Sequence, residues 1–297
     1  MTTQSDATRR GLRFSKRIVV KAGTPVLTHM DGNIALGRIG SLVEQIAELR
    51  REGRDVFLVT SGAIGTGSNR IVKNQTLASN MRESLENGIQ RTNQSAAAAV
   101  GQSLMMSLYE TLFNKYNLSC AQVLVTESDI SDPATIAQVG ETTDELLQFG
   151  IVPIINENDA VTSRSEPVFD EDSLEVKWDN DALASKLAVE LRADLMVVLT
   201  DIDGLYTMTS SGIAERVPLY TRGMQLARSE IPDAGKQSLG DENRGDFEGR
   251  TRMSEMGLKA LVASAVDATA NGVRAVVVTT GHHPRALLQV CCALFAP

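Results

Sequence analysis

The sequence predicts a doubly wound α/β fold, in which a mainly parallel sheet is covered by helices on both faces. Short apolar, β-branched runs of the length of buried strands recur along the chain. Segments with apolar residues at helical spacing lie between them. With 42% hydrophobic and 22% charged residues, the composition is that of an ordinary globular protein, which excludes disordered and fibrous classes.

The apolar runs predict strands at 18–20, 56–59, 121–125, 151–155, 195–199 and 275–278. Helical spacing predicts helices at 39–49, 95–116 and 181–191. Gly53 follows the first helix and is a typical stop signal. This helix therefore joins the first two strands in a βαβ unit. The polar stretches 72–94, 162–177 and 227–249 lack apolar periodicity and are expected to be loops.

Residues 1–15 are polar and basic without periodicity, so we expect a flexible tail followed by a single domain over 16–297. The net charge of −8 offers no cationic field for nucleic acid. No apolar run approaches the roughly 20 residues that span a bilayer, so no membrane partner is expected. The three cysteines have neither zinc-site nor disulfide spacing, which indicates a reducing compartment and a cytoplasmic location.

Polar residues and glycines directly follow the first two strands. Lys21 and Gly23 follow the first strand as a phosphate-binding arrangement would, although no Walker pattern is present and an ordinary strand-end lysine remains an alternative. Ser61 follows the second strand, where a helix N-cap is the alternative. Parallel strands expose their carboxyl ends at one edge of a sheet, so these groups predict a shared ligand site.

Three further polar segments follow the same rule. Residues 156–159 are rich in carboxylates and amides that suit a ligand ammonium, with a solvated turn as the alternative. Residues 179–181 place two carboxylates on either side of an amide, just before a predicted helix. Capping of that helix is the alternative, but it would explain only one of these three polar residues. Residues 199–206 form an acidic turn with a glycine and a tyrosine, which suits a nucleotide's ribose and base.

These segments resemble, in order, those of the glutamate 5-kinases in the amino acid kinase family. The resemblance rests on residues 19–28, 59–64, 151–161, 179–183 and 199–206, and covers the chain from about residue 17 to residue 281. The start at Lys21 and the acidic turn are shared across the family. The segment 156–159 is characteristic of the glutamate enzymes.

The resemblance implies a three-layer αβα sandwich that transfers a phosphoryl group from ATP, accompanied by Mg²⁺, to the γ-carboxylate of L-glutamate. It implies catalytic roles for Lys21, Asp181 and Lys259, glutamate binding by Ser61, Asp159 and Asn180, and ATP binding by Lys21, Gly23, Thr200, Asp201, Met256, Gly257 and Lys259. No side chain is assigned to a metal. L-proline is an expected feedback inhibitor, and a homo-oligomer, dimer or tetramer, is expected.

The sequence departs from the resemblance in two places. The glycine-rich segment before the last long helix is altered at 249–259, where either Lys259, aligned on Met256, or an arginine, Arg250 or Arg252, can supply a second cation. Neither an RNA-modification-like domain nor a fused reductase is expected within this sequence. Two alternatives therefore stay open: a relative that phosphorylates N-acetylglutamate, aspartate or a nucleoside monophosphate, or a silent sensor of nucleotide or amino acid.

Overall fold

A computed structural model describes residues 11–78, 94–162, 180–208, 214–220, 224 and 255–292. Its central sheet contains β1 (Arg17–Ala22), β2 (Asp55–Val59), β3 (Ser119–Val125), β4 (Ile151–Glu157), β5 (Leu195–Thr200) and β8 (Ala275–Thr280). The strand order is β3-β4-β2-β1-β5-β8, and every neighbouring pair is parallel. A short antiparallel ribbon of β6 (Tyr206–Met208) and β7 (Ala214–Arg216) lies apart from this sheet. The predicted parallel sheet is confirmed.

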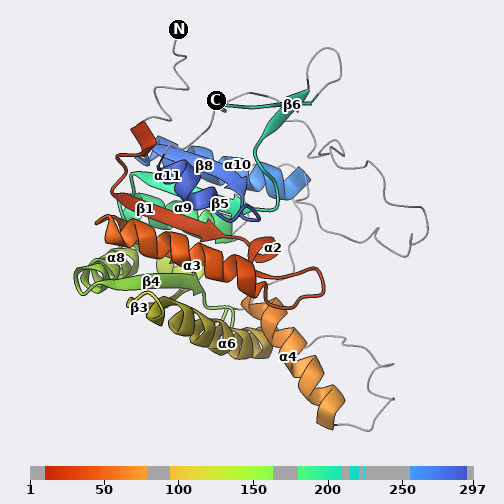
Figure 1. The fold of residues 1–297 in the computed structure, drawn as a ribbon. Coiled ribbons are helices and arrows are strands. Elements are labelled where there is room, and N and C mark those ends of the chain that lie inside the picture. The colour runs from red at the N-terminus through yellow and green to blue at the C-terminus, as the bar shows by residue number, and fades with distance from the viewer. Residues whose placement is uncertain are drawn as a thin grey trace.

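Helices cover both faces of the sheet, which gives three layers (Figure 1). One face carries α2 (Thr24–Leu27), α3 (Leu36–Arg51), α6 (Gln94–Asn114) and α11 (Ala286–Cys291). The other carries α7 (Glu127–Ser131), α8 (Pro133–Gln148), α9 (Asn180–Glu190) and α10 (Glu255–Ala270). Because side chains alternate along a strand, β1 sends Ile18 and Val20 into the first layer and Val19 into the second.

One predicted loop is partly wrong, because α4 (Ala63–Ala78) includes the first part of the stretch 72–94. Once a helix has begun, each further residue adds a hydrogen bond, so polar residues can extend it without an apolar face. Residues 79–93 of that stretch lie outside the described part of the chain. The same holds for residues 163–179 and 225–254, which contain nearly all of the other two predicted loops.

Two glycines set the contact between α4 and α6. A Cβ on Gly67 would lie 1.8 Å from the Ala97 carbonyl oxygen, and a Cβ on Gly101 would lie 1.8 Å from the Ala63 carbonyl oxygen. Both distances are far shorter than van der Waals contact, so the two helix backbones touch at positions where only glycine, which has no Cβ, can fit. This close crossing fixes α4, which begins next to the carboxyl end of β2.

Candidate functional site

The strand order reverses its direction at β1, which lies between β2 and β5. In an open parallel sheet, a crevice forms at the carboxyl ends of the strands where such a reversal occurs, and ligands bind there. Lys21 occupies the carboxyl end of β1, paired in register with Val59 on one side and Val198 on the other. The fold therefore puts this lysine at the position where a ligand is expected.

Lys21 forms a buried ion pair with the first turn of α9. Its Nζ lies 2.6 Å from Oδ1 of Asp181, and the two side chains are only 9% and 11% exposed. Removing two charges from water is costly, so such a pair persists only where its geometry is well fixed. The two residues lie 160 positions apart in sequence, and the structure brings them together as one unit.

Gly23 lies directly beside this pair. A Cβ at this position would be 3.5 Å from Nζ of Lys21 and 3.4 Å from the carbonyl oxygen of Leu199, which are ordinary van der Waals contacts. The Gly23 amide donates to the carbonyl oxygen of Leu199 at 3.0 Å, which ties the end of β1 to β5.

Ser61 joins the same edge from the end of β2. Its hydroxyl donates to the carbonyl of Ala22 at 2.9 Å and accepts from the hydroxyl of Thr24 at 3.2 Å. Gly62 follows with φ of +88°, a conformation that favours glycine. Ser61 is thus held against Ala22, the residue between Lys21 and Gly23. The structure therefore brings Ser61 next to these two predicted site residues.

Two asparagine side chains carry buried polar atoms without partners. Asn156, in β4, is 1% exposed, and neither its amide nitrogen nor its amide oxygen has a hydrogen-bond partner among the described residues. The side-chain oxygen of Asn180, the first residue of α9, is in the same condition. Buried polar groups are normally hydrogen-bonded, so unpaired ones call for a partner such as a ligand.

The sequence interpretation included Asn180 but did not single out Asn156 within the segment 156–159. The signal available was strand alternation, since an asparagine near the end of a central strand is buried on one face of the sheet. Asp159, which was singled out, is buried with 8% of its surface exposed, two residues after β4 ends.

The opposite side of the crevice is formed by the end of β5. Thr200 is 2% exposed, its hydroxyl donates to Oδ1 of Asp201 at 3.0 Å, and its carbonyl accepts from the Gly281 amide at 2.8 Å. The tyrosine and the second aspartate of the turn are also joined, because the Tyr206 hydroxyl donates to Asp203 at 3.0 Å. The predicted acidic turn is therefore ordered by its own side chains.

Helix α10 packs against this turn. Leu258 and Val262 form a small apolar cluster with Ile202, which is the residue after Asp201. Met256 and Gly257 lie in the first turn of α10, and Lys259 follows with an exposed side chain. Arg250 and Arg252 lie outside the described residues. The structure thus brings the segment of Lys259 beside the acidic turn.

The described site is a crevice with a buried cation, paired to a carboxylate, between an amide-rich half and an acidic-turn half. The chain belongs to the amino acid kinase family, whose model matches residues 16–280. Two solved structures share the fold at 14% sequence identity. One is a carbamate kinase from Giardia lamblia bound to AMP-PNP, with a TM-score of 0.54 over 94% of this chain and 97% of that chain. The other is an isopentenyl phosphate kinase from T. acidophilum in a product complex, with a TM-score of 0.51 over 92% and 95%.

Curated relatives are more similar in sequence. Delta-1-pyrroline-5-carboxylate synthase 1 of Oryza sativa subsp. japonica is 39% identical over 285 residues, which are 96% of this chain and 37% of the relative. Glutamate 5-kinase of Symbiobacterium thermophilum is 44% identical over 198 residues, which are 67% of this chain and 68% of the relative. The chain thus spans little more than a third of the synthase and about two thirds of the kinase.

Proposed function

We propose that this chain transfers the γ-phosphoryl group of ATP to the γ-carboxylate of L-glutamate, which forms γ-glutamyl phosphate and begins proline biosynthesis. The observation that carries the proposal is the buried Lys21–Asp181 pair at the strand-order reversal. Relatives named glutamate 5-kinase and delta-1-pyrroline-5-carboxylate synthase support the choice of acceptor. In this reaction a glutamate oxygen forms a bond to the γ-phosphorus, the bond from that phosphorus to ADP breaks, and ADP leaves.

The residues of the crevice suit that reaction. Phosphoryl transfer asks a protein mainly for alignment and for positive charge near the oxygens of the transferred group. Lys21 would supply such a charge, and Asp181 would position it through their 2.6 Å contact. A γ-carboxylate is already ionised at neutral pH, so no general base is required.

Glutamate would occupy the amide-rich half of the crevice. The side-chain amide of Asn156 and the side-chain oxygen of Asn180 would bind its polar groups, and the carboxylate of Asp159 would accept from its ammonium. Ser61 would lie between this half and the lysine. The nucleotide would occupy the other half, next to Thr200 and Asp201.

Further details of the proposal rest on the resemblance to glutamate 5-kinases. Magnesium would accompany the nucleotide phosphates, L-proline would inhibit, and the chain would act in the cytoplasm as a homo-oligomer, a dimer or tetramer. No helix of the described part of the chain is both long and apolar enough to cross a bilayer. Raising L-proline at subsaturating glutamate should raise the apparent KM for glutamate. An unchanged KM would count against feedback control.

An acceptor assay tests the central proposal. With Mg-ATP and hydroxylamine, the purified protein should form a hydroxamate from L-glutamate and much less from L-aspartate or N-acetylglutamate. ADP release should be measured in parallel, because a nucleoside monophosphate acceptor would give ADP without a hydroxamate. Equal or faster turnover of another acceptor would overturn the choice of glutamate, and binding without turnover of any acceptor would indicate a sensor.

A further inference from the structure

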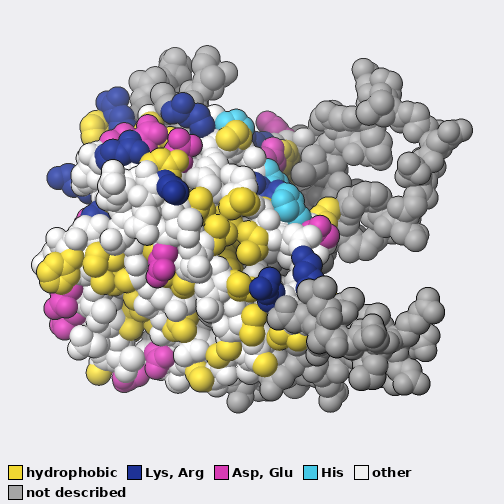
Figure 2. Space-filling view, turned by 60° about the horizontal axis from the view of Figure 1, so that its bottom comes forward, with side chains coloured by type: hydrophobic (Ala, Val, Ile, Leu, Met, Phe, Trp, Pro, Cys, Tyr) yellow, Lys and Arg dark blue, Asp and Glu magenta, His cyan; other side chains and the backbone are white. Residues whose placement is uncertain are grey.

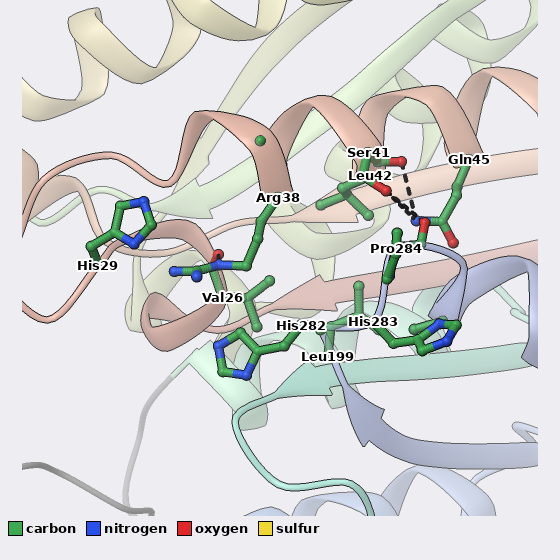
Figure 3. Close-up of a pocket in the computed structure, with 13 residues that line it drawn as sticks. Val26, His29, Arg38, Ser41, Leu42, Gln45, Leu199, His282, His283 and Pro284 are labelled. Atoms are coloured by element: carbon green, nitrogen blue, oxygen red, sulfur yellow. Dashed lines mark hydrogen bonds between the residues drawn. The ribbon is translucent and has the colours of Figure 1, made fainter. Parts of the chain in front are cut away.

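A second cavity lies on the other face of the sheet from the Lys21–Asp181 pair. It has a volume of about 280 Å³ and lies between α3 and the turn that joins β8 to α11 (Figure 3). Its apolar wall includes Val26, Leu42 and Leu199, which belong to the core cluster shared with α3 and α11. The partner of Lys21 lies in α9, whose core residues belong to the cluster on the opposite face. The cavity is therefore separate from the crevice described above.

The side chains of Arg38, His29 and His282 gather at one end of this cavity. All three histidines of the chain line it, together with Arg38. Arg38 donates from Nε to the Val26 carbonyl at 2.7 Å and from Nη2 to the Thr28 carbonyl at 2.6 Å, which fixes its guanidinium at this end of the cavity. Nη2 of Arg38 and Nε2 of His282 each lie 3.4 Å from the carbonyl oxygen of Pro25, so the two groups lie close together. Figure 3 shows the Arg38 guanidinium between the rings of His29 and His282, while His283 lies at the other end beside Pro284.

Among the described residues that line the cavity, none is Asp or Glu. The nearby Asp31 is exposed, and its carboxylate accepts from the backbone and side chain of Asn33 at 2.9 and 2.6 Å. Those hydrogen bonds lower the pKa of Asp31, with a smaller contribution from His29. The histidines reach the surface, where Figure 2 shows cyan His side chains next to dark blue Lys or Arg side chains.

The wall of the cavity is held by hydrogen bonds within the protein. The Ser41 hydroxyl donates to the Pro284 carbonyl at 2.6 Å. The side-chain oxygen of Gln45 accepts from the amides of Leu287 and Leu288 at 2.9 and 3.2 Å. The first amides of α11 are therefore already satisfied, and the cations at the other end are what an anion would meet.

We propose that this cavity binds a small carboxylate with an apolar body. The carboxylate would lie against Arg38, His29 and His282 through charge-assisted hydrogen bonds, and the hydrocarbon part would cover Val26, Leu42 and Leu199. Ligand pockets usually measure roughly 300–1,000 Å³, so the volume of this one is suited to a molecule of amino-acid size. Inorganic phosphate would satisfy the cations but leave the apolar wall uncovered.

The histidines provide a direct readout, since the untagged protein has only three and all of them line the cavity. Proton NMR at pH 6.5 would follow their Hε1 resonances, assigned with single His→Gln variants. Isovalerate is expected to shift the signals of His29 and His282 saturably. Its neutral isostere isovaleramide and inorganic phosphate are expected to bind at least about tenfold more weakly.

A variant within the cavity and a control variant on the surface complete the test. His282→Gln should weaken isovalerate binding about tenfold, because one charge-assisted contact is lost. Arg51→Gln removes one positive charge from the far end of α3, where the side chain is exposed, and should leave the affinity unchanged. The proposal is overturned by equal binding of the amide or of phosphate, by no saturable shift, or by an equal effect of the two variants. The binding measurements do not depend on kinase activity, so this test and the test of the proposed function can fail separately.

Discussion

Lys21 and Asp181 form the contact on which the proposed chemistry depends. Lys21 was predicted as a site residue from its position after a strand and Asp181 from the resemblance to glutamate 5-kinases, whereas the contact itself depends on the fold, in which α9 packs against β1. Their roles in turnover stay predictions. The unpaired amide of Asn156 was beyond the sequence analysis, since an unsatisfied hydrogen bond depends on what surrounds a side chain in three dimensions.

Lys21→Ala should lower kcat by roughly two to three decades, which is the usual effect of removing a group that stabilises transition-state charge. Steady-state kinetics of hydroxamate formation would measure it. Lys115→Ala, which removes an exposed lysine from the turn after α6, is the control and should be neutral. A folded Lys21→Ala enzyme with normal kcat would mean that the site is misplaced, and a loss confined to KM would mean ground-state binding only.

The pair of hydroxyls from Thr60 and Tyr109 should make stability fall at alkaline pH. Their oxygens lie 3.0 Å apart, and burial, partly offset by that hydrogen bond, raises the pKa of Tyr109 from 10.0 to about 12. The folded state therefore holds the phenol proton more tightly than the unfolded state. The resulting stability is complete below pH 10 and is lost as the pH rises towards 12.

Tyr109→Phe should destabilise the protein by about 1–3 kcal/mol at pH 8, because Thr60 is left buried without a partner. Urea unfolding at several pH values would measure the difference from wild type. That difference should shrink above pH 10, since the tyrosine of the unfolded state ionises there while the buried one keeps its proton. A difference that stays constant up to pH 11.5 would contradict the raised pKa. The double variant with Thr60→Val should recover most of the loss at pH 8.

At the scale of elements, the alternation of strands and helices was predictable because buried strands and amphipathic helices have distinct periods. Helix α8 was not among the predicted helices, although Pro133 at its first position and the Asp132 cap are start signals. Helix α4 was also not among the predicted helices, and its second half was predicted as loop because it lacks apolar periodicity. Its contact with α6 depends on a pair of glycines whose role only the packing reveals.

Gly67→Ala should therefore destabilise the protein by about 1–3 kcal/mol or more, since its methyl group would overlap the Ala97 carbonyl. Gly65→Ala on the same helix has open space around the new methyl group and should stabilise by about 0.4–1 kcal/mol. Urea unfolding of both variants would give the comparison. Similar stabilities would show that the close crossing has little energetic weight.

Helix α10 carries the riskiest assignment, that Lys259 supplies the second cation near the phosphates. Its segment packs beside the acidic turn through Leu258 and Ile202, which supports that position. Lys259→Met should lower kcat by roughly two to three decades and change the glutamate KM little. The kcat values of Arg250→Met and Arg252→Met should be measured in the same assay as that of Lys259→Met. If an arginine variant loses activity while Lys259→Met stays active, the alignment on Met256 is wrong.

At the scale of the whole molecule, β1 divides the central sheet into two parts. The strands β2, β4 and β3 extend from one side of it with the amide-rich residues, and β5 and β8 extend from the other with the acidic turn. The sequence predicted strands and their order along the chain but not their order in the sheet, because several parallel arrangements bury the same apolar runs. The reversal at β1 emerges only from the pairing, and it places the two proposed substrates on different sides of Lys21.

Hydrogen exchange should therefore separate the two substrates. Mg-AMP-PNP alone should slow amide exchange around Thr200–Asp203 and at the start of α10, and L-glutamate alone should slow it around Asn156–Asp159 and Ser61–Gly62. Both ligands should protect the end of β1 near Lys21, because each would contact that position from its own side. D-glutamate, which has the same charges and atoms as L-glutamate, serves as the control and should protect less. If glutamate instead protected the segment after β5, or the nucleotide the segment after β4, the assignment of the two halves would be reversed, whatever the activity assay showed.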